Sequence, residues 1–257
     1  MSNNDLFSMQ GKLALVTGAS SGLGKHFGQV LAHAGATVVL SARNVEKLQQ
    51  VLEQIQASGA VAHAVAMDVS NSSSVKNAMA QIVKQYGVPD VLVNNAGQSI
   101  AKPMLEQTEE DWDQILDTNL KGCWLVGTEL ARALAAAGKP GSIVNIASIL
   151  GERVGGAVGP YAISKAGLVQ ATKAMALELA RYNIRVNAIL PGYVATDMNS
   201  EFLASELGDK LRKRIPTRQF CELSDLTGPL LLLASNAGGG MTGACVAVDR
   251  GHLVSAL

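Results

Sequence analysis

The chain has 257 residues, of which 48% are hydrophobic and 16% charged, and this composition excludes an intrinsically disordered protein. Its 21 basic and 21 acidic side chains balance to a formal charge of zero, which argues against a nucleic-acid partner. Aromatic residues make up only 4%, and a core of Ala, Val, Leu and Ile suits a parallel sheet buried between helices.

Seven short β-rich segments alternate with helical patterns along the chain. We expect strands at residues 13–16, 37–40, 61–67, 91–93, 143–146, 185–190 and 245–248, and helices that include 45–57, 74–86, 109–136 and 161–182. This alternation predicts right-handed crossovers and an α/β fold with one doubly wound parallel sheet of about seven strands. Because no linker or repeat interrupts the pattern, residues 1–257 are expected to form a single domain, with 1–10 as an N-terminal extension.

The first predicted strand leads into a glycine-rich turn, Thr17-Gly18-Ala19-Ser20-Ser21-Gly22-Leu23-Gly24, and a helix follows it. Residues without a Cβ allow a tight strand-to-helix turn and let backbone N–H groups approach a pyrophosphate. The amino end of the helix adds partial positive charge at the same point. The turn therefore indicates a dinucleotide site, and a tight turn without a ligand is the alternative.

The second predicted strand ends Ser41-Ala42-Arg43-Asn44, with no acidic residue at its tip. An acid at this place binds the ribose hydroxyl of NAD, whereas a basic residue accepts the 2′-phosphate of NADP. Arg43 thus favours NADP(H), and NAD(H) is the alternative if Arg43 is only solvated or stacks on the adenine. Asp68, at the end of the third strand, either accepts a hydrogen bond from the adenine amino group or shapes the following turn.

Tyr161 and Lys165 lie four residues apart, which places both side chains on one face of a helix. An ammonium beside a phenol favours the phenolate, so such a tyrosine could pass a proton near neutral pH. Many surface helices carry a Tyr and a Lys at this spacing, and the pair alone is weak evidence. Its context strengthens it, because Ser148 follows the fifth strand and Asn94-Asn95-Ala96-Gly97 closes the fourth at the same sheet edge.

Taken together, these motifs closely resemble the short-chain dehydrogenase/reductase family, in its short single-domain branch. The resemblance covers residues 11–253, and its matching positions are Thr17–Gly24, Asp68-Val69, Asn94–Gly97, Asn119, Ser148, Tyr161, Lys165, Pro191-Gly192 and Thr196. It implies a Rossmann-like fold and an NAD(P)-dependent oxidoreductase that acts on a small-molecule ketone or secondary alcohol.

The resemblance also implies roles for individual residues. Tyr161 would be the catalytic acid/base, Lys165 would favour its phenolate and hold the nicotinamide ribose, and Ser148 would polarise the carbonyl. Asn119 would hold a water that links Lys165 to solvent, while Asn94 would mainly brace the sheet. The expected cofactor-binding set is Gly18, Ser20, Ser21, Gly22, Leu23, Gly24, Ser41, Arg43, Asn44, Asp68, Val69, Asn95, Ala96, Gly97, Tyr161, Lys165, Pro191, Gly192, Val194 and Thr196.

Residues 192–219 are the least regular part of the chain and are expected to form a substrate lid. The sequence does not identify the substrate. The substrate pocket is expected to be lined by Leu150, Val154, Val158, Tyr193, Met198, Phe202 and Leu203. One position departs from the family, which usually has Asp-Gly-Gly where this chain has Asp249-Arg250-Gly251. A positive φ at that place would strain Arg250.

The three cysteines are odd in number and widely spaced, which argues against disulfides and favours a reducing cytoplasm. The four scattered histidines predict no metal site, and no apolar run approaches the ~18 residues of a membrane span. The resemblance implies a homodimer or homotetramer built on the helices at 109–136 and 161–182. A non-catalytic dinucleotide-binding sensor or scaffold is the alternative of another class, and the intact Ser148, Tyr161, Lys165 and Asn119 set argues against it.

Overall fold

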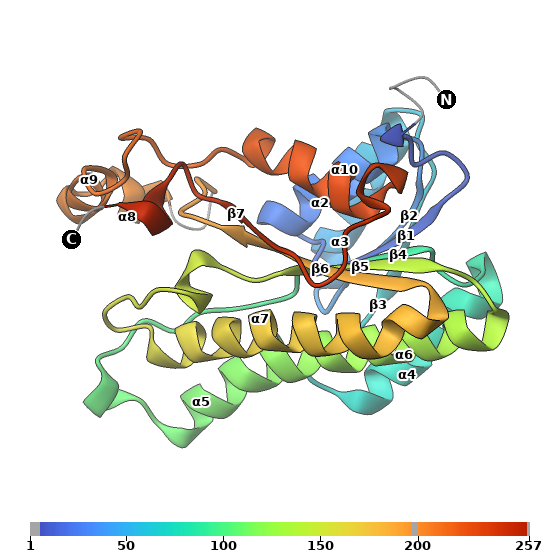
Figure 1. Cartoon of the computed structure of the whole chain (residues 1–257), viewed down its shortest axis with the longest axis horizontal. Coiled ribbons are helices and arrows are strands. Elements are labelled where there is room, and N and C mark those ends of the chain that lie inside the picture. The colour runs from blue at the N-terminus through green and yellow to red at the C-terminus, as the bar shows by residue number, and fades with distance from the viewer. Residues whose placement is uncertain (1–5, 197–199, 256–257) are drawn as a thin grey trace.

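The computed structural model describes residues 6–196 and 200–255, and a seven-stranded parallel sheet forms its centre (Figure 1). The strands are β1 Leu13–Thr17, β2 Thr37–Ala42, β3 Ala62–Ala66, β4 Val91–Asn94, β5 Gly141–Ile146, β6 Ile184–Pro191 and β7 Cys245–Val248. Their order is β3-β2-β1-β4-β5-β6-β7, and every neighbouring pair is parallel. The predicted single-domain α/β fold with one doubly wound sheet is confirmed.

Helices cover both faces of this sheet (Figure 1). They are α2 Gly22–His33, α3 Val45–Ala57, α4 Ser72–Tyr86, α5 Glu109–Leu116, α6 Gly122–Ala137, α7 Gly159–Leu179, α8 Ser200–Ala204, α9 Glu206–Arg212 and α10 Thr227–Ala234. Helices α2, α3 and α10 pack on one face through residues such as Phe27 and Leu230, and α4, α6 and α7 pack on the other through residues such as Leu130. Strands β1 and β4 are buried along their whole length, and they are apolar up to their last residues, Thr17 and Asn94.

The strand order reverses at β1, which lies between β2 and β4. In a sheet of this kind a crevice opens at the carboxyl ends of the strands where the order reverses, and ligands bind there. The turns that follow β1 and β4 therefore form the place where the sequence motifs should meet.

The predicted helix at 109–136 is interrupted in the structure. It begins with a capping box in which the Thr108 hydroxyl accepts from Asp111 N and the Asp111 carboxylate accepts from Thr108 N. After α5, residues Asp117–Lys121 form a π-helical turn, and α6 then continues to Ala137. Gly138 ends α6 in the left-handed conformation, with φ +61°, as its place after the helix predicts.

Helix α7 begins two residues before the predicted start at Tyr161. Pro160 lies in its first turn. Backbone N–H groups in the first turn have no intrahelical partner, so the missing N–H of proline costs no helical hydrogen bond. The predicted end at Tyr182 corresponds to a short 3₁₀ turn, Ala180–Tyr182, that follows the α-helical part. This start matters for function, because it places Tyr161 within the first turn of the helix.

The described part of the predicted N-terminal extension packs against the domain. Met9 is fully buried, and its backbone N–H donates to the carbonyl of Ala34 at the end of α2. Across residues 6–196 and 200–255, no helix has the length and apolar character needed to cross a membrane. The same ranges hold no group of three or more His, Cys, Asp or Glu side chains placed to bind a metal ion.

Candidate active site

The turns after β1 and β4 are joined at the carboxyl edge of the sheet. The Thr17 hydroxyl accepts hydrogen bonds from the backbone N–H groups of Asn95 and Ala96, each at 3.1 Å. In return, the Asn95 side-chain amide donates to the carbonyls of Thr17 at 3.0 Å and Gly18 at 3.2 Å. These bonds hold the two turns at a fixed separation.

Two glycines of the first turn leave no room for a side chain. A Cβ on Gly24 would lie 2.2 Å from the Gly18 carbonyl oxygen, and a Cβ on Gly18 would lie 2.8 Å from Ala96 Cα. Gly18 and Gly22 also have positive φ angles of +64° and +51°. The chain therefore makes a turn that only glycine permits, and the backbone there is bare.

The amino end of α2 suits an anion. Ser21 is its N-cap residue, but the Ser21 side chain makes no capping hydrogen bond, and the first turn holds no acidic residue. The first N–H groups of a helix have no intrahelical partner, and the helix dipole makes this end positive. The predicted residues Ser20, Ser21, Gly22 and Leu23 thus lie where a pyrophosphate would be bound.

Ser41, at the end of β2, carries a second unfilled hydrogen-bonding group. Its hydroxyl is buried and has no hydrogen-bond partner among the residues that the structure describes. Arg43, two residues on, is exposed, and its guanidinium forms no ion pair within the described ranges. Asn44 caps α3 by accepting from Lys47 N at 2.9 Å, which leaves its amide N–H groups for a ligand. A buried hydroxyl beside an arginine fits a phosphorylated adenosine.

Asp68 contributes to the turn before α4. One of its carboxylate oxygens accepts from Ser70 N at 3.0 Å and from the Ser70 hydroxyl at 2.7 Å. The neighbouring Val69 is buried against the start of α6, where a Cβ on Gly122 would lie 2.9 Å from Val69 Cγ2. The turn-forming role considered for Asp68 is thus present, and its other oxygen is not used within the described residues.

Lys165 lies in the buried floor of the site. Its side chain comes from α7 and is only 4% exposed, and its Nζ donates to the Ile146 carbonyl at 2.8 Å. The same Nζ lies 5.6 Å from the centre of the Tyr161 ring, one helical turn away. The strand β5 therefore anchors the ammonium while α7 places the phenol beside it.

Asn119 lies on the π-helical turn and is completely buried. Its side-chain oxygen accepts from Gln98 N at 2.8 Å, and its amide donates to the Gln98 carbonyl at 2.9 Å and the Ser164 hydroxyl at 3.1 Å. A Cβ on Gly97 would lie 3.3 Å from this oxygen and 3.6 Å from Lys165 Nζ. Gly97 thus allows the loop after β4 to pass close to both polar groups.

Ser148 leaves the end of β5 with an extended backbone and is 7% exposed. Its hydroxyl accepts from Leu150 N at 3.1 Å, which starts the turn Ile149–Gly151. This turn presses on α7, because a Cβ on Gly151 would lie 2.9 Å from the carbonyl carbon and oxygen of Lys165. The segment that begins at Ser148 therefore packs on α7 at Lys165.

The Cys123 thiol and the Tyr193 phenol, two further ionisable groups of this region, stay protonated near neutral pH. Burial raises the pKa of the Cys123 thiol to about 11, against the opposing effect of Lys165. Burial also raises the pKa of Tyr193, and the nearby Tyr161 adds to this. Neither group is therefore suited to proton transfer or nucleophilic attack near neutral pH.

The predicted lid leaves the site at the end of β6. Gly192 packs on the turn after β7, where a Cβ would lie 2.9 Å from Asp249 Cα. Val194 forms a parallel bridge with Cys221, whose N–H donates to the Tyr193 carbonyl at 2.9 Å. Of the predicted lining residues, Val154 is instead 91% exposed, while Met198 and the side chain of Phe202 lie outside the part that the structure describes.

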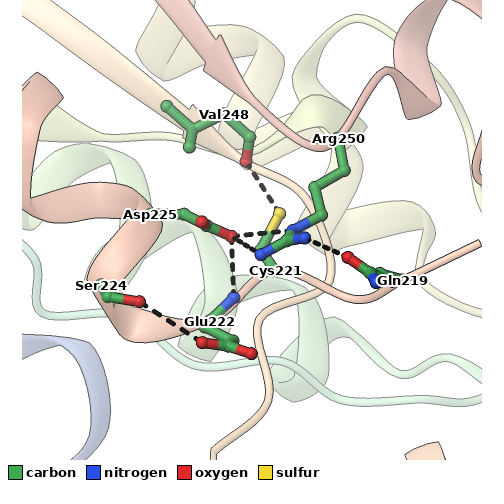
Figure 2. Close-up of polar contacts among 7 residues, drawn as sticks. All are labelled: Gln219, Cys221, Glu222, Ser224, Asp225, Val248 and Arg250. Atoms are coloured by element: carbon green, nitrogen blue, oxygen red, sulfur yellow. Dashed lines mark hydrogen bonds and ion pairs between the residues drawn. The ribbon is translucent and has the colours of Figure 1, made fainter. Parts of the chain in front are cut away.

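Arg250 contacts Gln219, at the end of the predicted lid, and Asp225 (Figure 2). It has a φ of +54°, as expected from the glycine usually found there, and such a conformation costs about 1–3 kcal/mol for a residue with a side chain. Its Nε and Nη2 lie 2.9 and 2.7 Å from Asp225 Oδ2, and its Nη1 donates to Gln219. Asp225 also accepts from Glu222 N at 3.0 Å. These bonds hold Arg250 in its strained conformation and tie the turn after β7 to the lid.

Several supporting residues were not singled out from the sequence. Thr17 lies within the predicted glycine-rich turn, but the sequence predicted no role for its side chain or for Gln98. Ser164, three residues after Tyr161, donates to the Tyr161 carbonyl at 2.7 Å while it accepts from Asn119. Its spacing on the Tyr161 face of the helix was the available signal.

A cavity of ≈ 360 Å³ at the opposite, amino edge of the sheet includes Arg185 in its lining. The Arg185 guanidinium donates to the carbonyls of Leu233 at 2.9 Å, Ser235 at 3.1 Å and Met241 at 3.3 Å. Its charge therefore joins β6 to the segment around α10, and the polar groups suited to a dinucleotide lie at the carboxyl edge.

Residues 18–252 match a family model described as enoyl-(acyl carrier protein) reductase. A gluconate 5-dehydrogenase of Gluconobacter oxydans is 37% identical over 256 residues, which cover 99% of this chain and 100% of that protein. A 3-oxoacyl-(acyl carrier protein) reductase of Staphylococcus epidermidis is 35% identical over 241 residues, or 93% of this chain and 98% of that protein.

Among solved structures, a gluconate 5-dehydrogenase from Burkholderia cenocepacia in complex with NADP and tartrate superposes with a TM-score of 0.94. It is 32% identical, and the alignment covers 98% of this chain and 99% of that one. The similarity therefore extends over nearly the whole of both chains.

Proposed function

The chain belongs to the short-chain dehydrogenase/reductase family, and on this premise we propose that it interconverts a ketone and a secondary alcohol with NADP(H), using Tyr161 as the acid/base. That it is an NAD(P)-dependent oxidoreductase acting on a CH–OH group follows from the family. The observation that carries the finer proposal is the meeting of Tyr161, Lys165 and Asn119 beside the glycine-rich turn.

The residues fit a dinucleotide along the carboxyl edge of the sheet. The uncapped end of α2 would hold the pyrophosphate, and Ser41 with Arg43 would hold the phosphorylated ribose. The segment Asn95–Gly97 and the stretch from Pro191 to Thr196 would hold the nicotinamide end. When bound, the cofactor supplies the hydride in reduction and accepts it in oxidation.

Tyr161 moves the proton in this proposal. In the reductive direction its hydroxyl donates a proton to the carbonyl oxygen, and in the oxidative direction its oxygen accepts one from the alcohol. The Ser148 hydroxyl lies on the adjacent segment and donates a hydrogen bond to the same oxygen. Lys165 keeps two of its three N–H groups after the bond to Ile146, and these would hold the nicotinamide ribose.

Asn119 serves mainly as a positioning residue. Both N–H groups of the Asn119 side-chain amide donate hydrogen bonds to Gln98 and Ser164. A water that links Lys165 to solvent would therefore donate its hydrogen bond to an oxygen of Asn119. Its bonds to Gln98 also fix the loop that begins at Gly97. The amide thus holds the floor of the site in place around the ammonium.

The preference for NADP(H) rests on Arg43, which forms no ion pair with the described residues, and on the buried hydroxyl of Ser41. The Burkholderia relative with bound NADP supports it. We expect Arg43→Ala to raise KM for NADPH at least tenfold and to leave KM for NADH nearly unchanged. A charge-assisted contact of this kind is worth about 1.5–3 kcal/mol, or roughly ten- to a hundredfold in affinity. The check is steady-state kinetics with both cofactors.

The matched control for Arg43 is Arg181→Ala, which removes an exposed arginine just before β6 that stacks on Tyr182. It should change neither KM. Parallel weakening of NADPH and NADH binding in Arg43→Ala would mean that Arg43 stacks on the adenine, and the enzyme would then accept both cofactors.

We also propose that residues 192–219 act as a lid over the substrate. Tyr193, Ala195 and Cys221 fasten its base by backbone bonds, so that closure would move the stretch that carries α8 and α9. Amide hydrogen exchange of the lid should slow when NADPH and a substrate analogue bind, while exchange of β5 stays the same. Equal exchange of the lid with and without ligands would remove this role.

The expected homodimer or homotetramer is supported by apolar side chains exposed on α5, α6 and α7. Trp112 is 42% exposed, Trp124 48% and Leu177 81%, and such residues are typical of subunit interfaces. The free thiols of the three cysteines are consistent with the proposed cytoplasmic location.

A non-catalytic dinucleotide sensor is the competing class. The enzyme and the sensor are distinguished by following the absorbance of NADPH in the presence of a panel of carbonyl compounds. The panel includes oxo acids, acyl thioesters, cyclic ketones and keto sugars. Consumption of NADPH supports the enzyme, and tight NADPH binding with no turnover across the panel would support the sensor.

A further inference from the structure

An aromatic wall leads away from the reacting hydroxyl towards the carboxyl end of the chain. The nearby Tyr161 adds to the effect of burial in raising the pKa of Tyr193. The centre of the Tyr193 ring lies 5.8 Å from that of His252 and 6.5 Å from that of Phe220. His252 begins the 3₁₀ turn His252–Val254 that follows β7. The C-terminal turn thus lies against the ring of Tyr193.

His252 has an unfilled hydrogen-bonding group at this place. The residue is only 9% exposed, and its Nδ1 is buried without a hydrogen-bond partner in the described part of the chain. Burial lowers the pKa of His252, and the nearby Arg153 and Arg214 lower it further. A buried imidazole nitrogen without a partner is costly unless a ligand or water fills it.

Two arginines act on the same histidine. Arg153 lies on the loop that leaves Ser148, and its Nη1 donates to the His252 carbonyl and to the Ser255 hydroxyl. Its Nε and Nη2 have no partner within residues 6–196 and 200–255. Arg214 comes from the lid, and its side chain is exposed and forms no ion pair among the described residues.

The acid that acts on His252 is already engaged. Asp249 acts on His252, but its two carboxylate oxygens accept from Gly251 N at 2.9 Å and Leu253 N at 2.6 Å. Asp249 therefore shapes the turn after β7. Among the described residues, neither Arg153 nor Arg214 forms an ion pair with a carboxylate.

We propose that Arg153, Arg214 and His252 form an anion subsite that binds the carboxylate of a hydroxy-acid or oxo-acid substrate, at the end of the substrate remote from the reacting carbon. This rests on the proposed function, since the subsite matters only if the alcohol or ketone reacts at Tyr161. A guanidinium matches the two oxygens of a carboxylate, and the imidazole offers a further donor. An acyl thioester presents no charge at this distance and would gain nothing from the subsite.

The subsite also joins the lid to the substrate. Arg153 belongs to the body of the domain and Arg214 to the lid, so a carboxylate held between them would draw the two together. This explains how a free acid would be preferred over a neutral polyol of the same length. The gluconate dehydrogenases among the relatives are named for such an acid, and tartrate, found with the Burkholderia enzyme, is another.

The test compares gluconate with glucitol, which carries a CH₂OH group in place of the carboxylate, both with NADP⁺. In the wild type we expect gluconate to have the higher kcat/KM. In Arg153→Met the ratio of the two kcat/KM values should fall at least tenfold, and the loss should appear in KM for gluconate. Arg153→Lys keeps a charge without the fork and should lose less. Binding of tartrate to the NADP⁺ complex, measured by calorimetry, should weaken in the same order.

Ser255→Ala is the matched control, because it removes one hydrogen bond of Arg153 to the C-terminal turn but keeps the guanidinium. It should retain the wild-type ratio. If Arg153→Met proves unstable, Arg214→Met tests the same subsite from an exposed position. An unchanged ratio and unchanged tartrate affinity in both methionine variants would overturn the subsite. A wild type that turns over acyl thioesters but binds neither gluconate nor tartrate would also overturn it while leaving the proposed function intact.

Discussion

Replacing Tyr161 by Phe is expected to lower kcat by about 100- to 10,000-fold, the range that a positioned proton donor contributes. The Tyr161 hydroxyl forms no hydrogen bond with the described residues, so its removal breaks no contact that stabilises the fold. The aromatic ring stays beside Lys165. We therefore expect the melting temperature and the NADPH affinity to remain close to those of the wild type. Turnover, thermal unfolding and NADPH fluorescence titration together provide the measurement.

Tyr182→Phe is the control, since Tyr182 is 40% exposed and lies beyond the end of α7. It should behave as the wild type in all three measurements. If Tyr161→Phe is folded and keeps a near-wild-type kcat, another group supplies the proton and the assignment of Tyr161 is wrong.

Replacing Gly24 by Ala is expected to abolish useful cofactor binding. The added Cβ would lie 2.2 Å from the Gly18 carbonyl oxygen and 2.5 Å from the Asn95 amide nitrogen. Backbone cannot yield as a flexible side chain does, so the whole turn must shift away from the end of α2. Losing one charge-assisted hydrogen bond costs about 1.5–3 kcal/mol, and a shifted turn loses several. We expect Kd for NADPH to rise at least a hundredfold in a fluorescence titration.

The overpacked turn should also destabilise the protein, by about 1–3 kcal/mol in denaturant unfolding. Gly240→Ala is the matched control, because a Cβ there meets no atom within 4 Å. It should change neither Kd nor stability by a comparable amount. An unaltered NADPH affinity in Gly24→Ala would show that the cofactor binds elsewhere.

The sheet could be predicted from the sequence because its signals are local. Each strand is a short apolar run followed by turn residues, and each helix repeats apolar residues at the helical period. The parallel order follows from the alternation, which then places the ends of β1, β4 and β5 at one edge. Tyr161 and Lys165 are likewise a local pair, four residues apart on one helix.

The surroundings of that pair depend on contacts between residues far apart in sequence. The bond from Asn119 to Ser164 spans 45 residues, and the bond from Arg153 to His252 spans 99. No periodicity or spacing encodes such partners. Arg250 combines a local feature with a distant contact. Its positive φ could be expected from the Asp-Gly-Gly motif of the family, whereas its contact with Asp225 could not be expected from the sequence.

The π-helical turn at Asp117–Lys121 constrains the number of residues in its helix. A π turn holds one residue more than an α turn, which rotates α6 by about 100° relative to a direct continuation of α5. With this rotation Asn119 reaches Gln98 while Val126 and Leu130 still face the sheet. Deleting one residue from this segment would restore a regular α-helix. It would then turn either the Asn119 amide away from Gln98 or the apolar face of α6 away from the sheet. We therefore expect both the position of Asn119 and the packing of α6 to depend on the number of residues in this helix.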